Sequence, residues 1–395
     1  MQQQPRRRQS IDVFRAITMF FMIFVNDVDG VKNIPEWIKH VNENADGLGF
    51  ADTIFPSFLF IVGLSIPFAL NKRMQSGESK PAIALHIFLR SIALIIMGLF
   101  HVNLENYNRD AALLPASVWE ILITLAFFLI WLDYKPPAGK TKQYILQVAG
   151  IILLIVMAAL YKGDSHNGTI WMRPHWWGIL GLIGWAYLTC SLIYLSGNGK
   201  LKILLVAFVF FLIYTTLNQT EILKPVSGIL RYCWFLNGGS EVSFIMSGII
   251  VSVVYRKSSN SSRQQFFISM LIAGTFMIML GFLLRPFGGI SKIHGTPSWV
   301  GICTGISILV FSLLIYLIDI KGKADWFNII KPAGTSTLTC YLIPYFLYAF
   351  MVLFHLKYPV FLAEGIGGLL RSFAIAFIVI FITAFLEKKN MRLKI

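Results

Sequence analysis

Long apolar stretches follow one another along the sequence, separated by short segments rich in charge, proline or glycine. A helix that crosses a bilayer needs about 20 mostly apolar residues, and twelve stretches come close to that length. The pattern predicts an all-α fold: a polytopic transmembrane helix bundle of about 12 helices, with 10 or 11 as open alternatives. The predicted helices are 11–27, 51–71, 81–104, 116–134, 143–161, 176–196, 201–217, 239–256, 264–284, 298–318, 334–356 and 365–386.

Composition supports the same class of protein. Of 395 residues, 56% are hydrophobic and 13% are charged, and Phe occurs 33 times, which is more apolar material than a water-soluble core of this length requires. The bundle leaves little chain for a separate soluble catalytic domain, so we expect one integral membrane domain over 1–395. Residues 6–8 and the apolar run after them lack a small-residue cleavage site, which favours a retained first helix over a signal peptide.

The sequence carries 34 Lys and Arg against 19 Asp and Glu, a net charge of +15. Most of the basic residues fall in loops on one side of the predicted bundle, together with both termini, and the positive-inside rule makes that side cytoplasmic. Topology therefore explains the basic surplus without a nucleic-acid partner. The opposite side is slightly acidic, which suits a cationic ligand. The four cysteines are scattered without a CxxC pair, so neither a metal site nor a disulfide framework is predicted.

Charged residues inside the predicted helices need an explanation, because the hydrocarbon makes each one costly. Arg90 lies roughly 15 Å into helix 81–104, and His86 lies one turn before it on the same face. Arg90 either pairs with a buried acid as a structural clamp or contacts an anionic ligand that enters from the cytoplasm. Asp12 and Arg15 are three residues apart at the inner end of helix 11–27, where they can form a local ion pair.

The densest group of polar residues lies in the predicted outer loop 28–50 and at the two helix ends beside it. Its candidates for chemistry are a histidine, His40, an amide, Asn26, and a set of carboxylates. A histidine with acids around it can act as a general base near neutral pH, because a carboxylate fixes its tautomer and supports the imidazolium. An ordinary loop histidine is the alternative. The acidic members of the group are Asp27, Asp29, Glu36, Glu43, Asp46 and Asp52.

Two motifs carry a resemblance to a known family. Residues 8–15 read RQSIDVFR and open a helix that ends in Asn26, and residues 47–63 read GLGFADTIFPSFLFIVG and follow the loop histidine His40. Together they resemble the heparan-α-glucosaminide N-acetyltransferase family and its bacterial relatives. The Asp-x-x-Arg pair at the start of the first helix is more distantly similar to the wider transmembrane acyltransferase group. The resemblance covers roughly 6–104 and continues in patches beyond it.

The resemblance implies a transferase that moves acetyl from cytoplasmic acetyl-CoA, across the membrane, to the amine of a glucosamine unit. It gives the central role to the loop histidine, which His40 matches, with Asn26 close by. The chain departs from the animal enzyme in a slightly longer segment after His40 and in 105–175, which adds two helices. These departures favour a small amino sugar or a cell-wall fragment over a polymer as acceptor. They also divide the domain into a motif-bearing part, 1–104, an addition, 105–175, and a remaining bundle, 176–395.

We assign candidate roles on this basis. His40 is the general base or an acetyl carrier, Asn26 positions the thioester or its oxyanion, and Asp52, with Asp46 and Asp27 as alternatives, orients His40. Arg15 and Arg90 are candidates for contacts to the CoA phosphates or amides. The substrate-binding candidates are Asp27, Asp29, Asp46, Asn103, Glu105, Glu241 and Trp299, and the acetyl-CoA-binding candidates are Asp12, Arg15, Arg90 and Lys292.

The sequence thus favours a multi-pass enzyme of a bacterial inner membrane that binds acetyl-CoA and a glucosamine-type amino sugar and needs no metal. A homodimer is an open alternative to a monomer. Three other functions remain open: an amino-sugar or cation transporter without acyl transfer, an O-acetyltransferase of a cell-surface glycan, and a structural or sensory membrane protein. A transporter would be expected to show Gly- or Pro-broken helices in paired halves, which the sequence does not show by eye.

Overall fold

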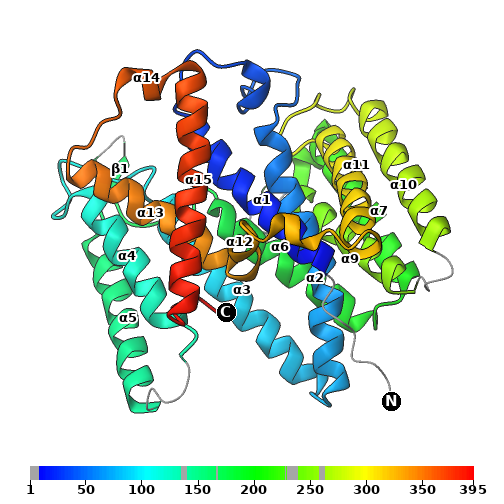
Figure 1. Ribbon diagram of the computed structural model, residues 1–395, viewed down its shortest axis with the longest axis horizontal. Helices are drawn as coiled ribbons and strands as arrows, with labels where there is room; N and C mark the ends of the chain where they lie inside the picture. Colours follow the sequence, from blue (N-terminus) through cyan, green and yellow to red (C-terminus); the bar gives the residue numbers. More distant parts are fainter. Residues whose placement is uncertain (1–8, 135–139, 166–167, 227, 229–238, 258–262) are drawn as a thin grey trace.

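The structure is a computed structural model that describes residues 9–134, 140–165, 168–226, 228, 239–257 and 263–395. Apolar helices build almost all of it, side by side and inclined to one another (Figure 1). The long helices are α1 (Gln9–Val28), α2 (Ala51–Gln75), α3 (Lys80–Val102), α4 (Ala116–Trp131), α5 (Lys140–Leu160), α6 (Gly178–Ser196), α7 (Leu201–Asn218), α9 (Ser240–Lys257), α10 (Arg263–Leu283), α11 (Pro297–Leu314), α13 (Thr337–Leu353) and α15 (Gly365–Lys388).

Short elements connect these helices. A two-stranded antiparallel hairpin in the α5–α6 connection is a small exception to the predicted all-α class. The short elements are η1 (Glu36–Ile38), β1 (Gly163–Ser165), β2 (Gly168–Ile170), η2 (Glu221–Val226), the π-helical turn η4 (Ile315–Ile320), η5 (Ala324–Phe327), α12 (Lys331–Thr335) and α14 (Val360–Ala363).

Each of the twelve predicted segments overlaps a long helix. Within the described residues, eight helices are long and apolar enough to cross a membrane, and α4 and α13 are shorter apolar helices. A polytopic helical bundle is therefore confirmed, whereas the count of twelve crossings and the side of each terminus stay predictions. One predicted helix, 334–356, is wrong in detail. The backbone leaves the helical conformation at Ser336 (φ −125°, ψ 48°), so α12 ends before this residue and α13 begins after it.

Close helix packing fixes α2 in the middle of the bundle. Gly63 of α2 and Gly248 of α9 meet where a side chain on either residue would collide with a backbone carbonyl of the other helix. Such small residues let two helix backbones approach closely, which is a common way to pack helices in a membrane. By contrast, α5, α7 and α10 expose many large apolar side chains, as lipid-facing helices do.

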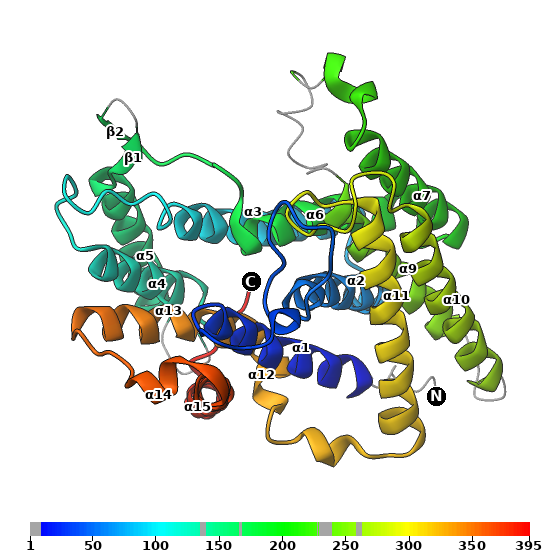
Figure 2. The same ribbon diagram turned by 90° about the horizontal axis from the view of Figure 1, so that it is seen from above.

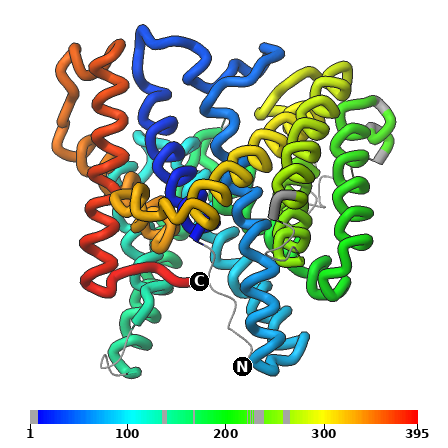
Figure 3. The backbone as a smooth tube through the Cα atoms, turned by 45° about the vertical axis from the view of Figure 1, so that its right-hand side comes forward, coloured from blue at the N-terminus to red at the C-terminus, as the bar shows by residue number. Residues whose placement is uncertain are grey.

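The bundle has two distinct ends. The loop between α1 and α2 lies at one end, and the turn between α2 and α3 lies at the other, as the tube in Figure 3 shows. Seen from above, the α1–α2 loop crosses the middle of the molecule between α1 and α11 (Figure 2). We call these the loop end and the turn end. Under the predicted topology they are the outer and the cytoplasmic end.

Candidate active site

At the loop end, His40 and Asp52 form a direct pair. The His40 Nδ1 atom lies 2.6 Å from the Asp52 Oδ1 atom. The His40 side chain is 30% exposed, whereas the Asp52 side chain is 3% exposed. Because a carboxylate accepts the Nδ1 hydrogen, the neutral imidazole keeps its lone pair on Nε2, which is the state that a general base or a nucleophile needs.

The turn of chain around Asp52 holds its carboxylate in place. Its Oδ2 atom accepts backbone N–H bonds from Val41 (3.0 Å) and Gly49 (3.1 Å). Gly49 is required by space, because a side chain there would collide with the Lys39 carbonyl. Both carboxylate oxygens of Asp52 are thus committed, one to His40 and one to the backbone. The carboxylate can orient His40 without needing a cation of its own.

A second loop brings a lysine to this pair. Lys292, in the α10–α11 connection, has its Nζ atom 3.2 Å from His40 Nδ1 and 3.4 Å from Nε2. Burial lowers the pKa of the Lys292 ammonium, and the negative charges of Asp52 and Asp29 oppose that shift. The sequence predicted Lys292 as a contact for acetyl-CoA; the structure places it beside the imidazole. His40, Asp52 and Lys292 are called the His40 cluster below.

Two contacts position the His40 cluster from outside. The Trp299 Nε1 atom, from the start of α11, donates to the Asp52 backbone carbonyl (3.1 Å), so this predicted substrate residue supports Asp52 from the buried side. Asp46 accepts from the Ile290 backbone N–H (2.7 Å) and from Arg285 Nε (2.8 Å). These two bonds tie the loop that carries His40 to the loop that carries Lys292, and they hold the pKa of Asp46 below its usual value of 3.8.

Asp27 is not part of the His40 cluster, although it was one of three carboxylates predicted to orient His40. Its Oδ2 atom accepts from Arg371 Nη2 (2.8 Å) and Ser372 Oγ (2.6 Å), and its Oδ1 atom accepts from Tyr348 Oη (2.7 Å). The pair is buried, at 4% exposure for the Asp27 side chain and 10% for Arg371. Asp27 therefore clamps α1 to α13 and α15, and it has no free oxygen for a substrate.

Other predicted substrate residues also have structural partners. Asn103 is fully buried, and its amide bonds the backbone of Leu99 and Arg173. Glu105 accepts from the Trp176 indole (3.0 Å) on the surface, and buried Glu241 accepts from Ser240 (2.9 Å). These three are not joined to the His40 cluster, and the exposed Asp29 contributes to it only through its charge.

Asn26 faces a different space from His40. It is exposed and lines a cavity of about 200 Å³ between α1, α4 and α13, with Glu120, Tyr341, Tyr345 and Tyr348 among the lining residues. The predicted convergence of Asn26 with His40 is therefore not present in this structure. This space is called the small cavity below.

Toward the turn end lies a larger cavity of about 690 Å³, here called the basic cavity. Its lining includes the two predicted arginines, Arg15 and Arg90, and also His86 on the face shared with Arg90. Lys72, Arg73 and Lys394 add further positive charge, while Glu78, which pairs with Arg73 (2.7 Å), is the one acidic side chain among the described lining residues. From the sequence, these three residues were explained only as part of the basic cytoplasmic side. Nothing in their sequence positions indicated that they line a cavity.

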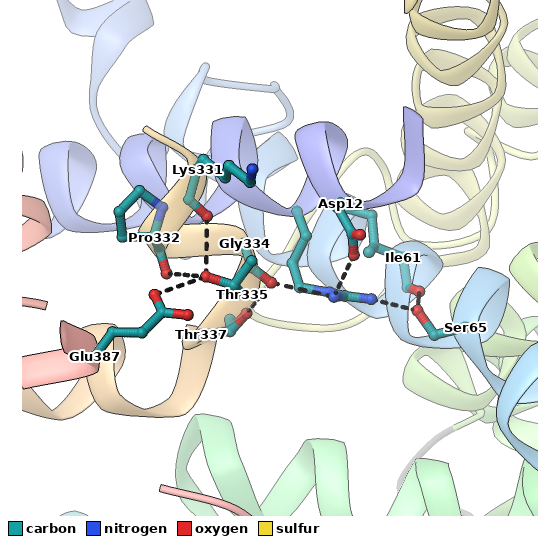
Figure 4. A network of polar contacts seen from close by, with 10 residues as sticks. Asp12, Ile61, Ser65, Lys331, Pro332, Gly334, Thr335, Thr337 and Glu387 are labelled. Carbon is teal, nitrogen blue, oxygen red and sulfur yellow. Dashed lines mark hydrogen bonds and ion pairs between the residues drawn. The ribbon is translucent and has the colours of Figure 1, made fainter. Parts of the chain in front are cut away.

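The two arginines of the basic cavity differ in their partners. Arg15 bonds Asp12 (3.1 Å), the Gly334 carbonyl (3.2 Å) and Ser65 (2.7 Å), in the network of Figure 4. The predicted Asp12–Arg15 ion pair is thus present. Arg90 packs over the Tyr187 ring at 5.0 Å, and among the described residues its guanidinium has no carboxylate partner. The predicted clamp for Arg90 is therefore not found in the described part of the chain, and the alternative, a contact to an anionic ligand, stays a prediction.

Within the described residues, no three of His, Cys, Asp and Glu gather in a way that could hold a metal ion. Cys190, Cys303 and Cys340 are buried and free, and Cys233 lies outside the described residues, as do 6–8 at the N-terminus.

Comparisons with known proteins agree with the motifs. The family model described as "Domain of unknown function (DUF5009)" matches residues 7–237, which is more than half of the chain. Heparan-alpha-glucosaminide N-acetyltransferase from Homo sapiens is 40% identical over 104 residues, and the enzyme from Mus musculus is 38% identical over 112 residues. Each match covers 26% of this chain, but only 15% of the human protein and 16% of the mouse protein. The chain belongs to the DUF5009 family and is a relative of the heparan-α-glucosaminide N-acetyltransferases.

Proposed function

We propose that the protein is a transmembrane N-acetyltransferase that moves acetyl from acetyl-CoA to the amine of glucosamine or a related amino sugar. The observation that carries the proposal is the His40–Asp52 pair, in which a buried carboxylate saturated by hydrogen bonds holds an accessible imidazole. Neither ion transport nor a purely structural role requires such a pair. The similarity of about a quarter of the chain to N-acetyltransferases supports the same chemistry, and both residues lie within the family match at 7–237.

The reaction needs three things of the protein: a group to take the amine proton, positive charge for the oxyanion, and a hold on CoA. In direct transfer, the amine nitrogen attacks the thioester carbonyl, His40 Nε2 takes the amine proton and the CoA thiolate leaves. In the two-step route, Nε2 first attacks the thioester and the CoA thiolate leaves, which gives an acetyl-imidazole; the amine then attacks the acetyl carbon, the bond to Nε2 breaks, and Nε2 takes the amine proton. In both routes the Lys292 ammonium lies beside the imidazole, where it can stabilise the oxyanion.

The basic cavity fits acetyl-CoA by charge and by shape. Phosphates match its cations, and its residues on α2 run from Arg73 to Phe58, roughly 22 Å along the helix axis, which suits a long thioester arm. Arg15, Met19, Met22, Ile23 and Asn26 lie on one side of α1, where Arg15 and Met22 line the basic cavity and Met19, Ile23 and Asn26 line the small cavity. This face offers a path from the turn end toward the loop end.

We infer that the membrane is a bacterial inner membrane, with acetyl-CoA on the cytoplasmic side and the amino sugar on the other. The direct test uses purified protein in detergent with radiolabelled acetyl-CoA and a panel of acceptors. We expect label on glucosamine and none on glucose or N-acetylglucosamine. Label on the hydroxyl-only sugars would favour an O-acetyltransferase, and uptake of glucosamine into vesicles without acetyl-CoA would favour a transporter.

Sidedness is tested in sealed vesicles of known orientation. Acetyl-CoA should be required on the side of the turn end, and glucosamine should be accepted from the side of the loop end, because His40 lies in the α1–α2 loop. Product formed with both substrates confined to one side of vesicles that do not leak would contradict transfer across the membrane while leaving acetyl transfer intact.

A further inference from the structure

The small cavity contains a carboxylate that the mechanism above does not use. Glu120, in the first half of α4, lines this cavity and is partly buried. No described residue gives its carboxylate a hydrogen-bond donor or a cation, in contrast to Asp27, which has three partners at the same end of the bundle. A carboxylate in such a place is costly unless something neutralises it. Its presence points to a positively charged ligand.

The rest of the lining suits a small, hydroxylated cation. Tyr341 and Tyr345 lie with their hydroxyl oxygens 3.2 Å apart, and tyrosine rings attract cations at their faces. The Asn26 amide has no partner among the described residues and can both donate to and accept from hydroxyl groups. His101 stacks on Tyr345 with ring centroids 3.8 Å apart and holds that ring in place. A volume of about 200 Å³ is of the size of one sugar unit.

The small cavity also lies next to the path of the acetyl donor. Tyr341 lines both the basic and the small cavity, and the face of α1 that starts at Arg15 ends at Asn26, roughly 16 Å further along the helix. A ligand in the small cavity would therefore lie beside the basic cavity, next to Tyr341.

We propose that the small cavity is a binding site for the acceptor as a monosaccharide ammonium ion, with Glu120 as the group that binds the ammonium. Binding here is non-covalent and precedes the loss of the amine proton. The assignment of the ligand as the acceptor rests on the proposed acetyltransferase function, whereas the binding of an amino-sugar cation does not. Glu120 is then a specificity-determining residue, since it distinguishes an ammonium from an uncharged N-acetyl or hydroxyl group.

The test compares Glu120→Gln with the wild-type protein and with Glu364→Gln. Glu364 is the control because it also lies at the loop end, accepts a hydrogen bond from the Asn33 amide (2.8 Å) and lines neither cavity. Equilibrium binding of radiolabelled glucosamine to the full-length protein in detergent is measured without acetyl-CoA, with unlabelled N-acetylglucosamine as competitor. Steady-state transfer then gives KM for glucosamine and for acetyl-CoA.

We expect Glu120→Gln to weaken glucosamine binding and to raise its KM roughly tenfold or more, because a charge-assisted contact is lost. KM for acetyl-CoA should change less than about twofold, Glu364→Gln should behave like wild type, and N-acetylglucosamine should compete poorly. Thermal unfolding without ligand should show Glu120→Gln at least as stable as wild type, because an uncompensated charge has been removed.

The two proposals fail in different ways. Acetyl transfer with an unchanged KM for glucosamine in Glu120→Gln would overturn the cavity assignment and leave the acetyltransferase intact. Glucosamine binding that depends on Glu120 in a protein without transfer activity would overturn the acetyltransferase and support the cavity.

Discussion

Asp27, at the end of α1, and Asp52, at the start of α2, are both buried acids at the loop end, yet their partners differ. Asp27 receives an arginine, a serine and a tyrosine from α13 and α15, which together satisfy it completely. Asp52 receives two backbone N–H groups and a histidine whose side chain is partly exposed. The first arrangement holds helices together, and the second fixes the orientation of a partly exposed imidazole, which we propose to be catalytic.

The largest expected effect is on the rate of acetyl transfer when the His40–Asp52 pair is broken. His40→Ala should lower the rate of acetyl transfer by about 10²–10⁴-fold, the contribution of a general base, with little change in stability. The matched control is His294→Ala, because His294 lies in the loop of Lys292 and its side chain is 49% exposed. The rate is measured with radiolabelled acetyl-CoA. Transfer near the wild-type rate in His40→Ala would show that the His40–Asp52 pair is not catalytic, and Asp52 would then have a structural role, as Asp27 has.

Breaking the Asp27–Arg371 pair should instead lower stability and leave turnover nearly unchanged. Asp27→Asn leaves the buried Arg371 without its counter-charge and should lower the free energy of unfolding by about 3–5 kcal/mol, while the turnover of the protein that remains folded changes little. Thermal unfolding in detergent measures the loss. The double variant Asp27→Asn with Arg371→Met should recover part of it, since no buried charge remains unpaired. A stable single variant with lost activity would mean that Asp27 serves the chemistry.

Local patterns predict the helices well, because an apolar run carries its own signal. They also predict His40 and Asp52 as a group, since only twelve residues separate them. What assigns a role to each acid comes from far along the chain: Arg371 lies 344 residues after Asp27, and Lys292 lies 252 residues after His40. Such partners meet only through helix packing. The sequence therefore could not show that Asp27 belongs to a separate clamp, or that Lys292 lies beside the His40 imidazole.

The same contrast between satisfied and unsatisfied charge separates Arg371 from Arg90. Because Arg90 has no carboxylate partner among the described residues, Arg90→Ala should leave stability unchanged and raise KM for acetyl-CoA roughly tenfold to a hundredfold, equivalent to about 1.5–3 kcal/mol. KM for the amino sugar should stay constant. Lys202→Ala removes an exposed charge at the start of α7 and is the control. Misfolded Arg90→Ala protein would instead indicate a structural clamp.

The smallest expected effect concerns Asp46, an acid that is neither clamp nor catalyst but ties two loops together. Its ion pair with Arg285 is about half exposed, so Asp46→Asn should cost at most about 1 kcal/mol of stability and lower activity at most about fivefold, because the His40 cluster is held less firmly.

The pH dependence of this stabilisation follows from the partners of Asp46. The Ile290 N–H and Arg285 lower the pKa of Asp46 below 3.8 in the folded state. The stabilisation is therefore complete above about pH 4 and is lost as the pH falls through that lowered pKa. Thermal midpoints of wild type and variant should differ near neutral pH, approach each other in acid, and differ less in high salt. A difference that grows as the pH falls would show that the Asp46 carboxylate does not stabilise the two loops.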